Sequence, residues 1–441
     1  MVLRMPTFDR RGFLQALGAG LLCSGVRAHG GALSGLSSAA DADTLQRFVR
    51  QHNQFALALH RALGGRGNLF HSPLSVWTAL AMLAEGAQGE TRVELERALG
   101  AVRSAGGLKP ASDPTVAGAR LLAERLAALG EGAELRQADA VWVDRAFGVN
   151  PATLQALRAR FGAAVEGLDL RGAPDEARAH INRWVEERTR GNIRDLLPEG
   201  SLTPLSRLVL TDAVHFLGRW QAPFLPKLTR SAHFRRPNGS TASVPFMHVE
   251  AAVPVREGSF DAAGAPRDPW ESGRGGSTWL ELPYKGDTAA FLAVMPDEHD
   301  GLPALEQGLD ATTLAARSAA LRQTNLMLRV PKLKLASRCD LVAPLRALGV
   351  ERAFDASRAD LSAFAAPDEP DGRSLHVTGA FHAATLAVDE QGTEAAAATG
   401  IVLGVRSAPR FVSLERPFLV FIRERETGAV LFMGRVTDPS A

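Results

Sequence analysis

The chain has 441 residues, of which 46% are hydrophobic and 22% are charged, and its formal net charge at pH 7 is +2. This composition is typical of a globular protein with a large core, and the near-neutral charge gives no indication of a nucleic-acid partner or of a strongly membrane-attracted surface. Neither an internal repeat nor a long linker divides the chain, so the sequence itself marks no domain boundary in spite of the length.

Residues 1–28 are predicted to be an export signal of the twin-arginine type. Arg10 and Arg11 precede an apolar run that is too short to span a membrane comfortably, and an acceptable small-residue cleavage site follows at residues 26–28. A disordered N-terminus is the alternative interpretation. The signal predicts a bacterial protein that is exported to the periplasm or the extracellular space, with residues 29–41 as a flexible segment before the folded domain.

The two cysteines bear on the compartment and on stability. Cys23 raises the alternative of a lipoprotein, but Leu22 before it is a poor fit to the small residue that such a site prefers. Removal of the signal leaves Cys339 as the only cysteine. The mature protein would then have no intramolecular disulfide, and its stability would come from packing.

The first half of the chain is predicted to be mainly helical. Apolar residues from Leu45 to Leu59 follow the i, i+3, i+4, i+7 spacing of a helix with one buried face. Ser72 and Pro73 are typical of an N-cap and a first turn, and the apolar run to Leu83 predicts a helix that is buried on every side. Two further helices are expected, one beginning at residues 150–151 and one carrying the apolar residues of 177–185.

The second half is predicted to consist mostly of strands, which makes the fold class α+β. Apolar or alternating runs predict strands at residues 138–143, 208–217, 279–282, 291–294 and 326–335, and a hairpin of residues 418–422 and 429–436. A turn is expected at residues 237–239, a polar surface insertion at residues 258–276, and a helix capped by Asp340.

Residues 388–399 carry an unusual run of small side chains. Four small, uncharged residues alternate along it and would share one face of an extended chain: Thr393, Ala395, Ala397 and Thr399. They would fit a crowded, dry layer without overpacking, while Glu394 on the opposite face would stay in water. Taken alone, the segment also fits a piece of helix or a low-complexity linker. Residues 403–410 are polar and irregular enough for an exposed loop.

Several segments together resemble the serpin family. Residues 390–399 are similar to the reactive-centre hinge of inhibitory serpins. Further motifs of the family are matched, in chain order, by residues 68–75, 86–91, 182–193, 282–286, 331–332, 359–362, 416–418 and 432–435. The resemblance covers residues 42–441 and implies one serpin domain with three β-sheets (A, B and C), about nine helices and an exposed reactive-centre loop at about residues 390–411.

The resemblance assigns the hinge to a specific run of residues. It implies that the cleaved loop inserts as a new central strand of the main sheet, a switch known for serpins in general. The hinge residues are Glu390, Gly392, Thr393, Glu394, Ala395, Ala396, Ala397, Ala398 and Thr399. Bulky, charged or Pro residues at the inward positions are common in non-inhibitory serpins, which act as binders, carriers or folding helpers. This hinge has none of them there, which favours an inhibitor over that alternative.

Four residues correspond to the serpin shutter, where the main sheet opens: Ser72, Ser75, Asp212 and His382. Trp220 corresponds to the breach of the same sheet. Asp212 departs from the usual Asn of the family, and a buried carboxylate needs a donor, which His382 as an imidazolium would supply. This pairing would make opening of the sheet sensitive to pH. The alternative is that Asp212 accepts hydrogen bonds from the backbone or from serine and has no special role.

The resemblance also locates the bait bond. The scissile residue of the family lies fourteen positions after the hinge glycine, Gly392, and this position is Arg406, followed by Ser407. Arg410 is the nearest competitor, but Pro409 before it and the shorter return to the body disfavour it. An Arg at the scissile position implies a trypsin-like serine protease as the partner, because such an enzyme has a carboxylate at the base of its primary pocket. An Arg-specific cysteine protease is a second possible target class.

The signatures of an enzyme are missing from the sequence. It contains no Gly-x-Ser-x-Gly nucleophile elbow, no His-Glu-x-x-His motif and no phosphate-cradling Gly loop, and its 11 histidines are scattered without ligand spacing. We therefore expect an inhibitor without catalytic residues, metal or cofactor. A monomer with no nucleic-acid partner and no membrane span is expected.

Overall fold

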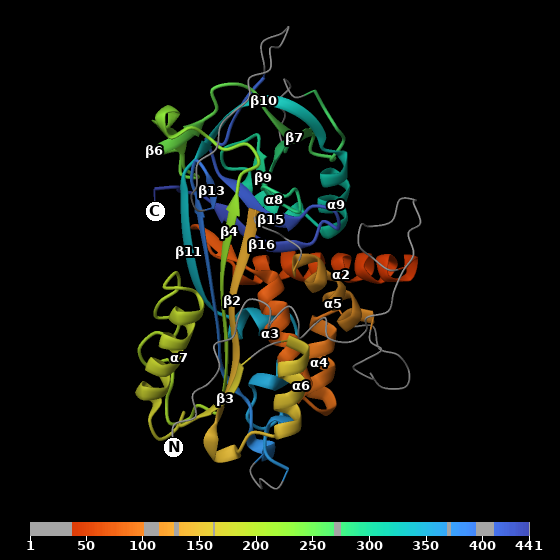
Figure 1. The fold of residues 1–441 in the computed structure, drawn as a ribbon, viewed down its shortest axis with the longest axis vertical. Helices are drawn as coiled ribbons and strands as arrows, with labels where there is room; N and C mark the ends of the chain where they lie inside the picture. Colours follow the sequence, from red (N-terminus) through yellow and green to blue (C-terminus); the bar gives the residue numbers. More distant parts are fainter. Residues whose placement is uncertain are drawn as a thin grey trace.

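The computed structural model describes residues 38–100, 114–127, 132–161, 164–268, 275–367, 372–393 and 410–440. Nine α-helices and sixteen β-strands lie in this part of the chain, with most of the helices before most of the strands (Figure 1). The predicted α+β class and the expected helix content are confirmed for these residues. None of the described helices combines the length and the apolar character needed to cross a membrane.

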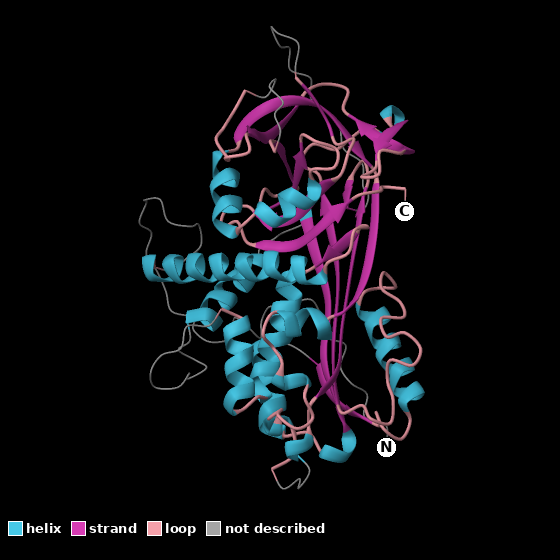
Figure 2. Cartoon of the chain, turned by 180° about the vertical axis from the view of Figure 1, so that it is seen from behind, coloured by secondary structure: helices cyan, strands magenta, loops and turns pink. Residues whose placement is uncertain are grey.

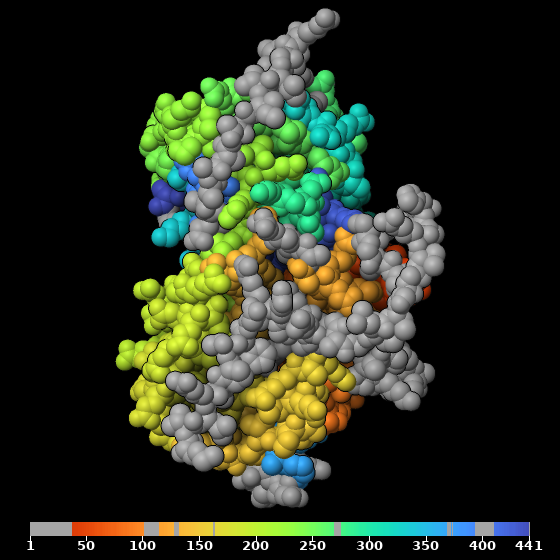
Figure 3. All heavy atoms as spheres, viewed as in Figure 1, coloured from red at the N-terminus to blue at the C-terminus, as the bar shows by residue number. Residues whose placement is uncertain are grey.

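Most helices of the first half pack beside one face of a long sheet, whereas α7 lies on the other face (Figures 1 and 2). In the space-filling view, the yellow-green segment around α7 forms its own surface below the green strands (Figure 3). The helices are α2 (Ala39–Leu63), α3 (Pro73–Gly86), α4 (Gly89–Ala98), α5 (Pro114–Ala127), α6 (Pro151–Phe161), α7 (Pro174–Arg188), α8 (Leu302–Gly308), α9 (Ala311–Ala320) and α10 (Val342–Ala347).

Helix α3 is buried on nearly every side, as its apolar sequence predicts. Ser72 caps it by accepting the N–H of Ser75 at 3.2 Å, and Pro73 occupies the first turn. Val76 and Leu80 join residues of α2 in a core that lies against the long sheet. The first turn of α3 is therefore fixed close to the middle of that sheet.

The long sheet has the strand order β11-β12-β4-β2-β3, with β13 also paired to β4. It consists of β2 (Ala133–Asp144), β3 (Ala164–Leu168), β4 (Leu208–Arg219), β11 (Leu333–Asp340), β12 (Val377–Val388) and β13 (Gly392–Thr393). Residues of β4 alternate between two cores. Leu208 and Leu210 pack on the side of α3, and Val209 packs with Ile181 of α7. Both faces of the sheet are therefore covered.

The other strands form two sheets that share β10. These strands are β1 (Leu69–His71), β5 (Arg230–Arg235), β6 (Thr241–His248), β7 (Val253–Phe260), β8 (Ser277–Pro283), β9 (Ala289–Pro296), β10 (Arg322–Pro331), β14 (Phe411–Ser413), β15 (Phe418–Glu424) and β16 (Val430–Val436). The first part of β10, residues 322–326, pairs with β7, and its last part, residues 329–331, pairs with β6. Together with the long sheet, this arrangement agrees with the three sheets that were expected.

Two expectations about individual elements were wrong. The strand expected at residues 326–335 is two strands in different sheets, because Pro331 lacks an N–H and ends β10, and the N–H of Lys332 then donates to Pro245 at 2.9 Å. The insertion expected at residues 258–276 begins later, since residues 258–260 belong to β7 and Phe260 is buried.

Candidate functional site

The candidate site is the line along which β12 and β4 meet, which we call the seam. These two strands pair directly and in parallel, residues 377–385 against residues 208–215. The next strands outward, β11 and β2, are antiparallel to their partners. A parallel pair is slightly less stable per residue than an antiparallel one. A strand that entered the seam antiparallel to both neighbours would therefore replace a weaker ladder with two stronger ones.

Strand β13 already enters the top of the seam. The chain turns after β12, and Gly392–Thr393 pair antiparallel with Gly218 and Arg219 of β4. Gly392 has a φ of 141°, and a Cβ at this position would lie 2.0 Å from the carbonyl oxygen of Gly218. Only glycine allows the hinge backbone to approach β4 so closely.

Trp220 holds the turn that leads into β13. Its backbone N–H donates to the carbonyl of Gln391 at 2.9 Å, and its indole Nε1 donates to the carbonyl of Asp389 at 2.9 Å. The buried indole stacks on Tyr284, with ring centroids 4.8 Å apart. Trp220 thus lies where the hinge enters the sheet, next to the residues assigned to the hinge.

Glu390, the first residue assigned to the hinge, fixes the start of that segment. Its carboxylate accepts a hydrogen bond from Thr229 Oγ1 at 2.6 Å and one from Lys332 Nζ at 2.8 Å, and its carbonyl accepts the N–H of Phe224 at 2.7 Å. Burial acts to raise the pKa of Glu390, but the hydrogen bonds from Lys332 and Thr229 outweigh it and leave the pKa below its usual value. Thr229 and Phe224 come from a loop whose approach the sequence does not reveal.

The four predicted shutter residues meet beneath the middle of the seam. The N–H of Ser72 donates to Nε2 of His382 at 3.1 Å, and Ser75 Oγ hydrogen-bonds to Oδ1 of Asp212. His382 and Asp212 face each other across the seam, with Nδ1 of His382 3.1 Å from Oδ2 of Asp212. All four side chains are buried. The contact between His382 and Asp212 joins the two strands that would separate if the seam opened.

Sequence reasoning missed a fifth member of this cluster, Asp139. It lies on β2 directly opposite Asp212, and its Oδ1 is 3.2 Å from Ser75 Oγ. Burial, followed by the charge of Asp212, raises the pKa of Asp139 well above its usual value. An Asp within the apolar strand expected at residues 138–143 was a visible signal. The register between β2 and β4, which brings the two carboxyl groups together, was not.

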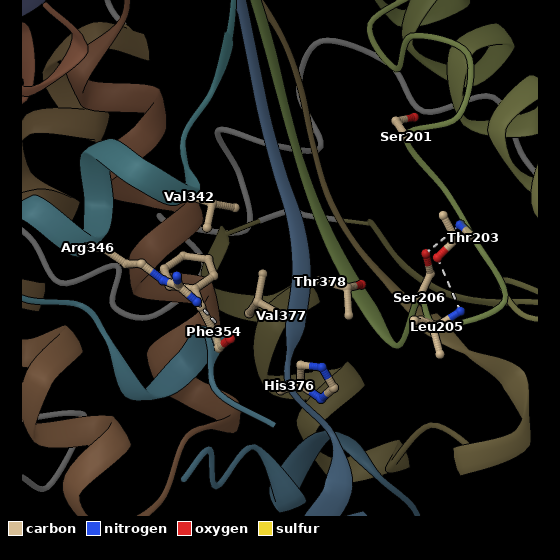
Figure 4. Close-up of a pocket in the computed structure, with 10 residues that line it drawn as sticks. All are labelled: Ser201, Thr203, Leu205, Ser206, Val342, Arg346, Phe354, His376, Val377 and Thr378. Atoms are coloured by element: carbon tan, nitrogen blue, oxygen red, sulfur yellow. Dashed lines mark hydrogen bonds between the residues drawn. The ribbon is translucent and has the colours of Figure 1, made fainter. Parts of the chain in front are cut away.

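A cavity lies at the foot of the seam, below the first pair of β12 with β4 (Figure 4). Its volume is about 330 Å³. The close-up shows residues of β12, α10 and the loop before β4 around it, and Leu205 at its edge is 73% exposed. The lining residues are Ser201, Thr203, Leu205, Ser206, Val342, Arg346, Phe354, His376, Val377 and Thr378.

The predicted bait bond, Arg406–Ser407, and the hinge residues from Glu394 to Thr399 lie outside the described residues, as does the export signal. Arg410, the competitor for the bait position, is described. Its guanidinium forms an ion pair with Glu257, and its carbonyl accepts the N–H of Met327 at 2.9 Å. These contacts tie Arg410 to the body of the protein, which disfavours it as a residue presented to a protease.

Comparisons with known proteins agree with this architecture. The family described as Serpin (serine protease inhibitor) matches residues 50–439. An uncharacterized serpin-like protein of Thermococcus kodakarensis is 33% identical, over 89% of this chain and 85% of its own. Plasminogen activator inhibitor 1 of Bos taurus is 33% identical, over 84% of this chain and 87% of its own. The structure of native protease nexin-1 with heparin superposes with a TM-score of 0.76 at 26% identity, over 90% of this chain and 100% of that one.

Proposed function

The chain belongs to the serpin family, and from this membership we propose that it inhibits trypsin-like serine proteases as a suicide substrate cleaved between Arg406 and Ser407. Serpins are mostly protease inhibitors rather than enzymes. In this proposal Arg406 is bait, and the chain contributes no catalytic residue of its own.

The observation that carries the proposal is the closed seam with β13 at its entrance. Continuing the register of β13 down β4 would set Ala395 opposite Phe216, Ala397 opposite Val214 and Thr399 opposite Asp212. Directly opposed residues share a face of a sheet, and these residues of β4 face the cores on the side of α3. The small side chains of the hinge would therefore enter the tightly packed core on the side of α3. Small side chains are what insertion without overpacking requires there.

The length of the loop supports the same proposal. In the continued register, Arg406 comes opposite Leu205, at the cavity that lies at the foot of the seam. The segment between the hinge and the bait bond would thus span the seam from one end to the other. A protease attached to Arg406 would be carried over this whole length.

The chemistry follows from the mechanism of serine proteases. The serine of the protease attacks the carbonyl carbon of Arg406, an ester bond to the enzyme forms, and the peptide bond breaks with Ser407 leaving as a new amine. Insertion of the freed strand then competes with attack of water on the ester. If insertion is faster, the protease is displaced and distorted and the ester persists. The free energy comes from the exchange of the parallel β12–β4 ladder for two antiparallel ladders.

The second candidate is a non-inhibitory serpin that acts as a binder, carrier or folding helper. The small residues of the hinge argue against it. An Arg-specific cysteine protease is a further possible target, because the bait residue would suit both enzyme classes. We also propose that the protein is exported by its N-terminal signal to the periplasm or beyond, where such proteases would be met.

The proposal is tested by mixing the mature protein with trypsin and analysing the mixture on a denaturing gel and by mass spectrometry. A band at the summed mass that survives boiling, together with a released peptide that starts at Ser407, is the expected result. Trypsin with a blocked active-site serine is the control and should give neither. Cleavage at Arg406 without the band would identify a substrate loop and would favour the carrier or folding helper.

A further inference from the structure

Two buried carboxyl groups face each other beside the seam. Asp139 of β2 and Asp212 of β4 are directly opposed, and their side chains are 7% and 1% exposed. Two like charges opposite each other in a sheet are destabilising, and burial makes the repulsion stronger. In the described part of the chain, neither carboxylate forms an ion pair with a Lys or an Arg.

The hydrogen-bonding groups around the pair fit a pair that holds a proton. Ser75 Oγ is within hydrogen-bond range of both carboxyl groups, but a hydroxyl has one hydrogen and can donate to only one of them. The second contact is a full hydrogen bond when one of the carboxyl groups donates to the hydroxyl oxygen. The raised pKa of Asp139, caused first by burial and then by the charge of Asp212, agrees with a proton on the pair.

His382 does not supply that proton as an imidazolium, contrary to the expectation from the sequence. A backbone N–H can only donate, so Nε2 of His382 must accept from Ser72 with its lone pair. The ring is therefore neutral, with its hydrogen on Nδ1. That nitrogen is 3.1 Å from Asp212, although the contact is not aligned as a hydrogen bond.

Other titratable groups pack around the cluster without neutralising it. On β1, His71 has a pKa well below its usual value, because of burial first and then the nearby His60, and burial also lowers the pKa of His60. Cys339 of β11 pairs with His382, and burial raises its pKa to about 11. His215 of β4 bonds to Thr385 instead. The carboxyl pair is thus the group in this cluster that is left to change charge as the pH rises through the raised pKa of Asp139.

We propose that Asp139 and Asp212 share one proton in the closed sheet and act as a latch on the seam, which loosens when that proton is released. Opening the seam separates Asp212 from His382 and admits water, so a hydrated pair ionises more readily than a buried one. The closed state therefore binds more protons than the open state. The proposal deepens the proposed function, since the latch would set how readily the loop inserts at a given pH.

The sign of the pH effect follows from proton linkage. At a pH below the usual value for Asp, about 4, the pair is protonated in the folded and the unfolded chain alike, and the stability it supplies is fully present. As the pH rises from there to the raised pKa of Asp139, the unfolded chain loses its proton while the folded chain keeps it, so stability falls; once the pH has passed through the raised pKa both have lost the proton and the contribution is gone. The opening rate should rise over the same range, by at most about tenfold per pH unit for release of one proton.

The test measures opening without any protease. A fluorescently labelled synthetic peptide with the sequence of residues 393–405 is incubated with the intact protein between about pH 5.5 and about pH 9.5, and its incorporation is followed by anisotropy and native gels. We expect incorporation to accelerate with pH. Asp139→Asn should remove the acceleration and keep the rate at the slow, acidic level, because the amide is uncharged and can donate to Ser75. A rate that is constant over this range, or an unchanged slope in Asp139→Asn, overturns the proposal.

Two further measurements keep the test decisive. Asp144→Asn is the matched control, since Asp144 is equally buried on β2 but pairs with Arg171 away from the seam, and it should keep the slope of the parent protein. Infrared difference spectroscopy of the parent protein needs no variant. It should detect a protonated carboxyl group at about pH 5.5, where an ordinary Asp is ionised, and its absence there refutes the shared proton. Because peptide incorporation does not depend on a protease, a failure of the inhibitory function would leave this result standing.

Discussion

Lys332 Nζ lies 2.8 Å from Oε2 of Glu390, and this ion pair joins the first residue of the hinge to the point where the chain passes from β10 to β11. The hinge is thus tied to the junction of two sheets. A weaker ion pair between Lys332 and Glu390 would therefore hold the top of the seam less firmly.

Replacing Glu390 with Gln should weaken this anchor while keeping an acceptor for Thr229. The lysine side chain is 37% exposed, so solvent screening limits the loss to about 1 kcal/mol. We expect a lower melting temperature and faster spontaneous insertion of the loop during storage. Lys334→Ala, at an exposed position nearby, should change neither property.

The stability that Glu390 contributes should also depend on pH. The pKa of Glu390 is below its usual value, so the stability from its ionised carboxylate is present above the usual pKa and is lost as the pH falls through the lowered one.

Adding a methyl group to Gly392 should prevent β13 from seating on β4. The new Cβ would meet the carbonyl of Gly218 at 2.0 Å, on a backbone with a φ of 141°. Gly392→Ala should therefore lower the melting temperature and slow formation of the trapped complex. Gly239→Ala separates the two causes, because Gly239 also has a positive φ, 81°, but nothing lies within 4 Å of its added Cβ. An equal fall in melting temperature and in the rate of complex formation for Gly392→Ala and Gly239→Ala would contradict the steric explanation.

Local patterns in the sequence predicted much of the fold, because they depend on neighbours along the chain. The cap and apolar run of α3 and the alternation of β2 are of this kind. The hinge pattern depends on alternation in the same way, although most of its residues are outside the described part. The three-sheet arrangement came from the resemblance, not from such patterns.

Contacts made by strand register could not be predicted in the same way. The opposition of Asp139 and Asp212, and the approach of Thr229 to Glu390, are set by pairings between distant segments. A single sequence without those pairings shows an Asp in an apolar strand but not its partner. The neutral state of His382 likewise depends on Ser72, whose N–H points at the ring only in the folded chain.

A charge on the inward face of the hinge should convert the inhibitor into a substrate. In the register of β13, Ala395 would come opposite the buried Phe216, so Ala395→Arg would have to bury an unpaired guanidinium during insertion. Water would then reach the ester before insertion is complete. Glu394→Arg is the matched control, since its side chain would lie on the other face. Gel analysis with trypsin should show cleavage alone for Ala395→Arg and a stable complex for Glu394→Arg. Trapping by both variants would show that this register is wrong.

Cleavage of the loop should make the protein more stable, because insertion adds a strand to the seam. The parallel ladder of β12 with β4 would be exchanged for two antiparallel ladders, each with new backbone hydrogen bonds worth about 1 kcal/mol apiece. The sum is on the order of 10 kcal/mol, which corresponds to a rise in melting temperature on the order of ten degrees or more. Calorimetry before and after nicking at Arg406 measures it. Ala395→Arg, nicked at the same bond, should gain much less because its hinge resists entry. If the parent protein melts at the same temperature before and after the nick, insertion of the loop does not stabilise the fold. The proposed trapping mechanism would then lack its source of free energy and would be wrong.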